Sequence, residues 1–144
     1  MNKKVLYYDD VQVGMELPEL VKHPTARQLV KWAGASGDFY EAHYDKDFAQ
    51  GSGLPGPIVH GNLVLSFLGQ MMTDWIGEMG ILRKLRCTFR GMFFPCQQVT
   101  CHGKVTRKYV RDGQGLVECE VWAENPKGEI PIPGTALVQL PTRV

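Results

Sequence analysis

The sequence lacks an excess of charge of either sign. Sixteen lysines and arginines stand against fifteen aspartates and glutamates, which leaves a formal net charge of +1 over 144 residues. Recognition of a nucleic-acid backbone needs a concentrated basic face. A chain whose positive and negative charges nearly cancel shows no sign of such a face. We therefore expect no nucleic-acid partner.

A long uninterrupted apolar run is also missing. The longest apolar stretch, from Leu63 to Ile76, is broken by polar residues and is shorter than the roughly 20 residues that span a bilayer. The first ten residues contain no apolar core of signal-peptide length and no small-residue cleavage site. These absences predict a cytoplasmic protein without a membrane partner.

Cysteines and histidines are few and scattered. The four cysteines form no Cys-x-x-Cys pair, and three of them fall in strand-like runs, which favours reduced thiols over disulfides or zinc. The four histidines show no metal-ligand spacing. We therefore expect no metal site. The cysteines are Cys87, Cys96, Cys101 and Cys119, and the histidines are His23, His43, His60 and His102.

What the sequence does contain fits one globular domain over residues 1–144, with 44% hydrophobic and 22% charged residues. Thr25 is a suitable N-cap for a helix that ends at the glycine-rich residues 34–37. Residues 38–57 are polar, aromatic and glycine-rich, which predicts a long ordered loop with one short helix. A loop of this length inside a small domain usually carries function.

The segment 62–76 is apolar around most of a helical circumference. A helix of this kind is buried on most sides, so another element must wrap it. The second half of the chain alternates apolar and polar residues over four runs, 84–93, 99–106, 117–124 and 129–140, which is the period of strands with one covered face. Residues 111–115 and 125–128 are hairpin turns. We predict an α+β hot dog fold, a curved antiparallel sheet around a central apolar helix.

The chemistry-bearing residues are Asp38 and His43, five positions apart in the long loop. A carboxylate and an imidazole that converge on one water can activate it and deliver its proton, since the imidazole titrates near neutrality. Gly37 permits a sharp turn before the carboxylate. An isolated pair of this kind is most often an exposed carboxylate and an unrelated loop histidine, so the neighbouring segments must decide.

The start of the apolar helix supplies the second part of the candidate site. Amides at a helix N-terminus carry partial positive charge and can stabilise an oxyanion, and Gly61 allows a ligand to approach its backbone. His60 and Asn62 flank that amide and are candidate substrate-binding residues. Ser66 either joins the site or bonds back to a carbonyl one turn earlier.

Three segments resemble the MaoC-like acyl dehydratases, the (R)-specific enoyl-CoA hydratase family. They are Ser36-Gly37-Asp38 followed by His43 and Ala49, then Val59-His60-Gly61, and then the run from Arg90 to Pro95. The resemblance implies a dimerising hot dog fold that hydrates trans-2-enoyl-CoA. It implies that Asp38 acts as the base toward a water that His43 orients, that His43 protonates C2, and that the Gly61 amide binds the thioester oxygen. Neither metal nor redox cofactor is then needed, because the CoA thioester is itself the electron sink.

Four positions depart from the family pattern. Tyr40 and Glu41 replace an Asn-Pro pair, Ala42 replaces a larger aliphatic residue, and Cys96 replaces a glycine. These departures leave the geometry of the catalytic loop open. They are similar to variants among bacterial acyl dehydratases that act on bulky acyl groups, sometimes as one half of a heteromer.

Two other functions compete with hydration. A hot dog thioesterase typically carries its carboxylate on the central helix, where this sequence offers only Asp74 at the far end. An acyl-binding subunit that completes a partner's site is favoured by the altered Tyr40-Glu41 pair and opposed by the intact Asp38 and His43. We therefore expect the partner to be either a second copy of the chain or a second hot dog subunit.

Several other side chains have both structural and functional interpretations. The basic residues Arg83, Lys84, Arg86 and Arg90 form either the solvent face of a strand or a contact for CoA phosphates. The tryptophans at 32, 75 and 122 are interpreted as core or interface residues. Met71 and Met72 are interpreted as core filling rather than as the lining of an acyl tunnel.

Overall fold

The computed structural model describes residues 5–143. Residues 1–4, where the segment without a signal-peptide pattern begins, lie outside the described part, as does residue 144. The regular elements are β1 (Leu20–Lys22), α1 (Ala26–Ser36), α2 (Lys46–Gly51), α3 (Gly61–Ile76), β2 (Ile81–Cys87), β3 (Val99–Arg111), β4 (Gln114–Glu124) and β5 (Ile132–Leu140), with single 3-10 turns at Tyr8–Asp10 and Glu41–His43.

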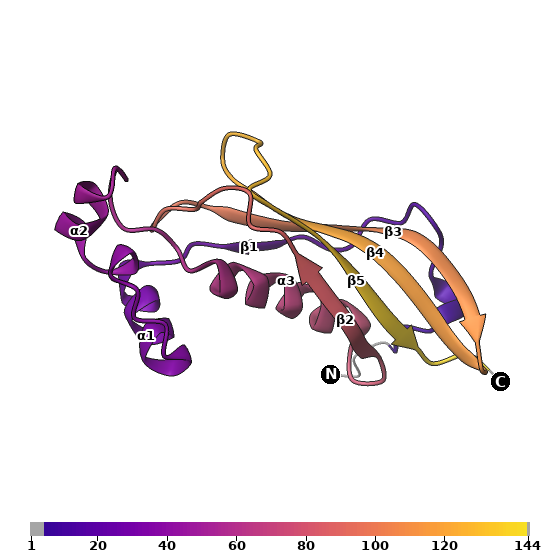
Figure 1. Cartoon of the computed structure of the whole chain (residues 1–144). Coiled ribbons are helices and arrows are strands. Elements are labelled where there is room, and N and C mark those ends of the chain that lie inside the picture. The colour runs from indigo at the N-terminus through magenta and orange to yellow at the C-terminus, as the bar shows by residue number, and fades with distance from the viewer. Residues whose placement is uncertain (1–4, 144) are drawn as a thin grey trace.

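The five strands form one antiparallel sheet in the order β1-β3-β4-β5-β2. The sheet curls as a half-barrel along α3, while α1 and α2 lie together beyond one end of that helix (Figure 1). This arrangement confirms the predicted hot dog fold. It also places the loop between α1 and α2 beside the N-terminal end of α3.

The central helix is covered by the sheet on one side only. Seven of its residues are buried, and these are Leu63, Val64, Phe67, Leu68, Met71, Met72 and Ile76. Asn62, Ser66 and Gln70 are exposed along the opposite side. The wrapping is therefore less complete than the apolar pattern predicted, because a half-barrel cannot enclose a helix. Met71 and Met72 belong to the core, as expected.

Local turn and cap signals in the sequence act as predicted. The Thr25 side chain accepts a hydrogen bond from the Gln28 amide over 3.2 Å and so caps α1. Gly37 ends that helix with a φ of 78°, a left-handed conformation that favours glycine. The β3–β4 hairpin turns at Asp112 and Gly113, whose φ angles of 51° and 74° are those of a type I′ turn.

Several strand boundaries differ from the prediction. β3 extends to Arg111 where the predicted run ended at 106, and β4 begins at Gln114 rather than at 117. The run 84–93 predicted a strand, whereas β2 covers Ile81–Cys87 and the chain leaves the regular ladder after Cys87. The amides of Thr88 and Arg90 still bond the carbonyls of Pro133 and Pro131, each over 2.9 Å, so this segment follows β5 without a full ladder. The prolines have no N–H to return these bonds, which also explains why β5 begins at Ile132 rather than at 129.

The described cysteines are all free thiols. Cys101 and Cys119 are buried in the core, and burial raises the pKa of each thiol to about 12. Both side chains therefore act as small apolar groups. Trp32 and Trp75 pack against the core, whereas Trp122 stacks on His102 with ring centroids 5.3 Å apart.

Among residues 5–143, no helix is both long enough and apolar enough to cross a membrane.

Cys96 occupies a backbone conformation that disfavours a side chain. Its φ is 66°, and a Cβ in this region costs roughly 1–2 kcal/mol. Its amide bonds the Pro24 carbonyl over 2.8 Å, which holds the turn. We expect Cys96→Gly to raise the free energy of unfolding by about 0.5–1 kcal/mol, after the greater freedom of glycine in the unfolded chain is subtracted. Thermal denaturation measures the gain. Cys96→Ala keeps the Cβ and should show none, so an equal gain in both variants would contradict the explanation.

Candidate active site

Asp38 is held at the end of α1 by a short chain of hydrogen bonds. The Ser36 hydroxyl donates to the Trp32 carbonyl over 2.7 Å and accepts from the Asp38 amide over 3.2 Å. One carboxylate oxygen, Oδ1, accepts from the Tyr40 amide over 3.4 Å. The side chain of Asp38 is 40% exposed, so its other oxygen, Oδ2, remains accessible. The glycine turn at Gly37 thus delivers a carboxylate to the surface of the loop.

His43 faces this carboxylate from the 3-10 turn Glu41–His43. Its Nδ1 lies 2.8 Å from the Ile58 carbonyl. A carbonyl can only accept, so Nδ1 carries the proton and Nε2 is the nitrogen that can exchange one. Nε2 lies 3.9 Å from Oδ2 of Asp38, and the imidazole side chain is only 9% exposed. The pair is therefore close and oriented, but it is not directly hydrogen-bonded.

Tyr40, the first of the two residues that replace the family Asn-Pro pair, holds the loop by aromatic contacts. The Tyr40 ring meets the rings of His43 and Phe48 edge-on, with centroids 5.8 Å and 5.7 Å away. Ala42 is completely buried, and its carbonyl accepts from the Ile58 amide over 3.0 Å. The loop is therefore ordered despite both departures. A larger residue at 42 would have to displace its neighbours.

His60 lies behind His43 rather than on the wall of a cavity. It is 0% exposed, and its ring stacks on that of His43 with centroids 3.8 Å apart and planes inclined by 19°. Its Nε2 lies 3.2 Å from the Asp38 carbonyl, while its Nδ1 is buried without a partner. The expected contact between His60 and substrate is thus replaced by a supporting contact, because both faces of its ring are enclosed. Sequence spacing gave no sign of this stack.

The helix start provides amides that no other group uses. Among the described residues, no hydrogen bond involves the amide of Gly61 or Asn62, whereas the Leu63 and Val64 amides both bond the His60 carbonyl. A cavity of about 360 Å³ opens at this helix start. Four of the predicted site residues line it, and these are Asp38, His43, Gly61 and Asn62. The rest of the lining is apolar apart from Arg90 and Gly91, and consists of Ile58, Val59, Phe89, Met92, Phe93 and Ile132.

The cavity brings together most but not all of the predicted site. Ser66 is exposed and bonds back to the Asn62 carbonyl over 2.9 Å, which is the structural alternative left open by the sequence. The wall formed by residues 89–93 was not predicted as part of the site. The segment from Arg90 to Pro95, which carries one of the three family resemblances, was the available signal for it.

Asp38, His43 and His60 each offer one potential metal-ligand atom, and these atoms lie within 4.8 Å of one another. The spacing of histidines in the sequence had not indicated such a cluster. The stacked rings, however, lie in nearly parallel planes, with centroids 3.8 Å apart and planes inclined by 19°. An ion in the plane of one ring therefore lies outside the plane of the other, which does not suit the in-plane ligation that imidazole nitrogens give a metal. The cluster is therefore better suited to proton chemistry than to metal binding.

Burial lowers the pKa of His60 below its ordinary value of 6.5, and the positive charge of a protonated His43 acts in the same direction, while the Asp38 carbonyl and carboxylate oppose both. The unfolded chain thus binds a proton at this residue more readily than the folded one, so stability rises with pH. We expect the Tm to fall as the pH drops below about 6.5. Scanning Tm across pH measures this dependence.

His60→Phe should lack that component of the pH dependence, because phenylalanine stacks without titrating. His23→Gln, at an exposed position, should keep the wild-type profile. A His60→Phe profile that runs parallel to the wild-type profile would rule out His60 as the source.

Comparisons with known proteins agree with this geometry. The chain matches the family described as "MaoC like domain" over residues 10–125. The 3-oxo-4,17-pregnadiene-20-carboxyl-CoA hydratase beta subunit of Mycobacterium tuberculosis is 29% identical over 117 residues, which are 81% of this chain and 88% of that protein.

Solved structures show the same fold. An (R)-hydratase from A. caviae involved in PHA biosynthesis superposes with a TM-score of 0.82 at 26% identity, covering 91% of this chain and 98% of that one. A MaoC-like dehydratase from Rhodospirillum rubrum superposes with a TM-score of 0.84 at 18% identity, covering 96% and 99%, which supports the fold alone. The matched region contains Asp38, His43 and the start of α3, and the chain belongs to the MaoC-like dehydratase family.

Proposed function

We propose that the protein adds water to a trans-2-enoyl-CoA to form a 3-hydroxyacyl-CoA, or removes it in the reverse direction. The observation that carries the proposal is the juxtaposition in one cavity of the Asp38–His43 pair and the unused amide of Gly61. The first two groups suit a water and its proton. The third suits the oxygen of a thioester.

The 3.9 Å gap between Oδ2 of Asp38 and Nε2 of His43 fits a shared water. A water at hydrogen-bond distance, about 2.8 Å, from both atoms completes a triangle with them. In hydration the water gives its hydroxyl to C3 and one proton to the pair, and the pair returns one proton to C2. We assign the first transfer to Asp38 and the second to Nε2 of His43 in its protonated form. The proton left on Asp38 then passes to Nε2 through the next water, so the pair is restored after each turnover.

The negative charge that develops on the thioester oxygen needs a donor that is already in place. The Gly61 amide is free and carries the partial positive charge of the N-terminus of a 16-residue helix. A donor fixed before the reaction costs no reorganisation as charge develops. Because this amide supplies the electrostatic stabilisation, we propose that no metal or redox cofactor takes part, and activity should survive prolonged treatment with a chelator.

The direct test follows the loss of the conjugated enoyl-thioester absorbance with a panel of short, medium and bulky enoyl-CoA substrates. We expect at least one substrate to be hydrated, with the product identified by mass spectrometry as the substrate plus one water. The absence of turnover with every substrate would refute the proposal. Release of free thiol without hydration would instead identify a thioesterase.

The structure offers little to a thioesterase of the kind whose carboxylate lies on the central helix. Asp74 is the acidic residue of α3, and it is exposed near the far end, about 20 Å along the helix from Gly61. It does not line the cavity that contains Asp38 and His43. Hydration is therefore the better-supported reaction.

We also propose that the working unit contains a second hot dog domain, either another copy or a related subunit. β2 pairs only with β5, so its outer edge is unpaired among the described strands, and Ile81 on it is 48% exposed. Unpaired edges of this kind are commonly covered by a partner. The beta-subunit name of the Mycobacterium tuberculosis relative makes a heteromer a specific alternative. Molar mass by light scattering, for the purified chain alone and after mixing with a related hot dog subunit, distinguishes the two.

A further inference from the structure

A second hollow, beside β2 and β5, shares Arg90 with the active-site cavity. Arg90 lines the cavity with Asp38 and His43, and it also lines a hollow of about 360 Å³ beside β2 and β5. The other residues of this hollow are Arg86, Cys87, Thr88, Pro133, Gly134 and Thr135. Arg90 therefore borders both the active-site cavity and a basic hollow.

Strand geometry explains why the two arginines share this hollow. Arg86 is in β2, and Arg90 lies four residues further along a segment that the Pro133 and Pro131 carbonyls hold beside β5. Arg86, Thr88 and Arg90 all line the hollow, although the regular strand ends at Cys87. The rise of about 3.3 Å per residue separates the two arginines by roughly 13 Å along the backbone.

Both arginines are available to a ligand. They are exposed, and no ion pair or hydrogen bond among residues 5–143 involves either side chain. By contrast, Arg83 bonds Gln139, Arg107 pairs with Glu118, and Arg143 pairs with Asp10. The hollow thus collects two of the uncommitted guanidinium groups of the molecule.

The composition of the hollow favours an anion. Its lining contains two guanidinium groups and the hydroxyls of Thr88 and Thr135, and it contains no carboxylate. A third hollow, of about 490 Å³, adjoins it at Gly134 and Thr135, but Glu118 and Glu120 line it beside Lys84. Those carboxylates make the third hollow unsuitable for phosphate, which limits the basic site to the Arg86–Arg90 hollow.

We propose that the Arg86–Arg90 hollow binds the phosphate groups of the CoA carrier, while the thioester end occupies the cavity with Asp38 and His43. The inference rests on the proposed function. Guanidinium groups form paired, charge-assisted bonds with phosphate oxygens. Two arginines set apart along the strand suit a ligand with phosphates at two positions, as in CoA, which carries a diphosphate and a separate 3′-phosphate. Arg83, which the sequence placed in the same basic cluster, is committed to Gln139 and is not part of this site.

The test compares one enoyl group on three carriers: CoA, dephospho-CoA and pantetheine, which has no phosphate. For Arg86→Gln and Arg90→Gln we expect KM for the CoA thioester to rise about tenfold each. Arg86 lies outside the active-site cavity, so Arg86→Gln should change kcat less than about twofold and should hydrate the pantetheine thioester as the wild type does. The KM for CoA should also rise with salt, whereas that for pantetheine should not.

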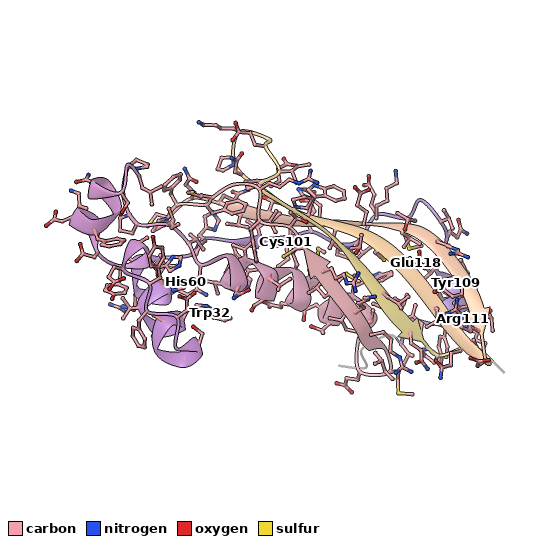
Figure 2. The ribbon with its side chains drawn as sticks, viewed as in Figure 1. Trp32, His60, Cys101, Tyr109, Arg111 and Glu118 are labelled. Carbon is pink, nitrogen blue, oxygen red and sulfur yellow. The ribbon has the colours of Figure 1, made fainter. Side chains whose placement is uncertain are left out.

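Arg111→Gln is the matched control, because this arginine lies at the end of β3 that is remote from His60 (Figure 2) and its guanidinium lies over the Tyr109 ring, 5.4 Å from the centroid. It should leave all three KM values unchanged. Equal losses on CoA and pantetheine in the Arg86 variant would overturn the inference. So would a wild-type enzyme that makes no distinction between the carriers, or one that prefers an enoyl group carried on an acidic carrier protein.

Calorimetric binding of free CoA separates this inference from the proposed reaction. We expect wild-type protein to bind CoA more tightly than pantetheine, and the Arg86→Gln/Arg90→Gln double variant to lose that difference. If CoA binds in this way but no enoyl thioester is hydrated, the proposed reaction fails and the phosphate site stands. If hydration proceeds but CoA and pantetheine bind alike, the phosphate site fails and the proposed reaction stands.

Discussion

Asp38→Asn should lower kcat/KM for enoyl-CoA hydration by about 10²–10⁴-fold, which is the range contributed by positioned acid–base groups. Asparagine keeps the size of the side chain and an oxygen that can accept from the Tyr40 amide, a bond of 3.4 Å in the wild type. It cannot take a proton from water. Because the side chain is 40% exposed, the Tm should change by no more than about 2 °C.

His43→Gln should cause a loss of similar size, and the double variant should be no worse than the poorer single variant, since groups that share one proton act as a unit. Asp45→Asn is the matched control. It changes a carboxylate in the same loop that caps α2 by accepting from the Phe48 amide over 2.9 Å, and asparagine caps a helix equally well. Multiplying losses in the double variant, or a comparable loss in Asp45→Asn, would contradict a shared proton at Asp38 and His43.

Gly61→Ala should lower kcat/KM by about 10²-fold, the typical effect of displacing a reacting group by an ångström, while the protein stays folded. A Cβ at this position would lie 2.8 Å from Cε1 of Phe89. The Phe89 ring is 52% exposed and can swing away, so the fold tolerates the methyl group. The methyl and the displaced ring then occupy the approach to the amide that holds the thioester oxygen.

Two further variants make this result decisive. Gly69→Ala lies on the same helix, where a Cβ would meet only Cδ2 of Leu85 at 3.6 Å, an ordinary contact. It should keep full activity and raise stability by up to about 1 kcal/mol, the difference in helix propensity. The Gly61→Ala/Phe89→Ala double variant should recover part of the lost rate. If Gly61→Ala kept the wild-type kcat/KM and the double variant showed no further change, Gly61 would not be part of the oxyanion site.

The elements that could be predicted from the sequence are those fixed by neighbouring residues. Thr25, Gly37 and the Asp112-Gly113 turn act through bonds and φ angles within a few positions, and the apolar pattern of α3 needs only its own residues. No pattern in the sequence predicted β1. It is a three-residue strand that exists only by pairing with Val99–Cys101, some 80 positions away along the chain.

The site was predictable to the same degree. Asp38, His43 and Gly61 each follow a local turn or begin a helix, so their motifs point to their positions. The ring stack of His43 on His60 and the wall at Phe89 depend on how separate segments pack, which no spacing in the sequence encodes. For the same reason His60 was assigned to substrate, although its ring is enclosed by the fold.

Four hydrogen bonds join the segments that carry the reacting groups. His43 bonds the Ile58 carbonyl, Ile58 bonds Ala42, His60 bonds Asp38, and the Val59 amide bonds the Phe93 carbonyl over 2.8 Å. These bonds hold the Asp38–His43 pair and the Gly61 amide in one fixed arrangement. Phe89 and Met92 beside it are about half exposed and stand outside the regular sheet. Directed evolution toward new acyl groups can therefore randomise these two positions without moving the catalytic groups. Substrate range and catalytic geometry can then be changed separately in one small scaffold.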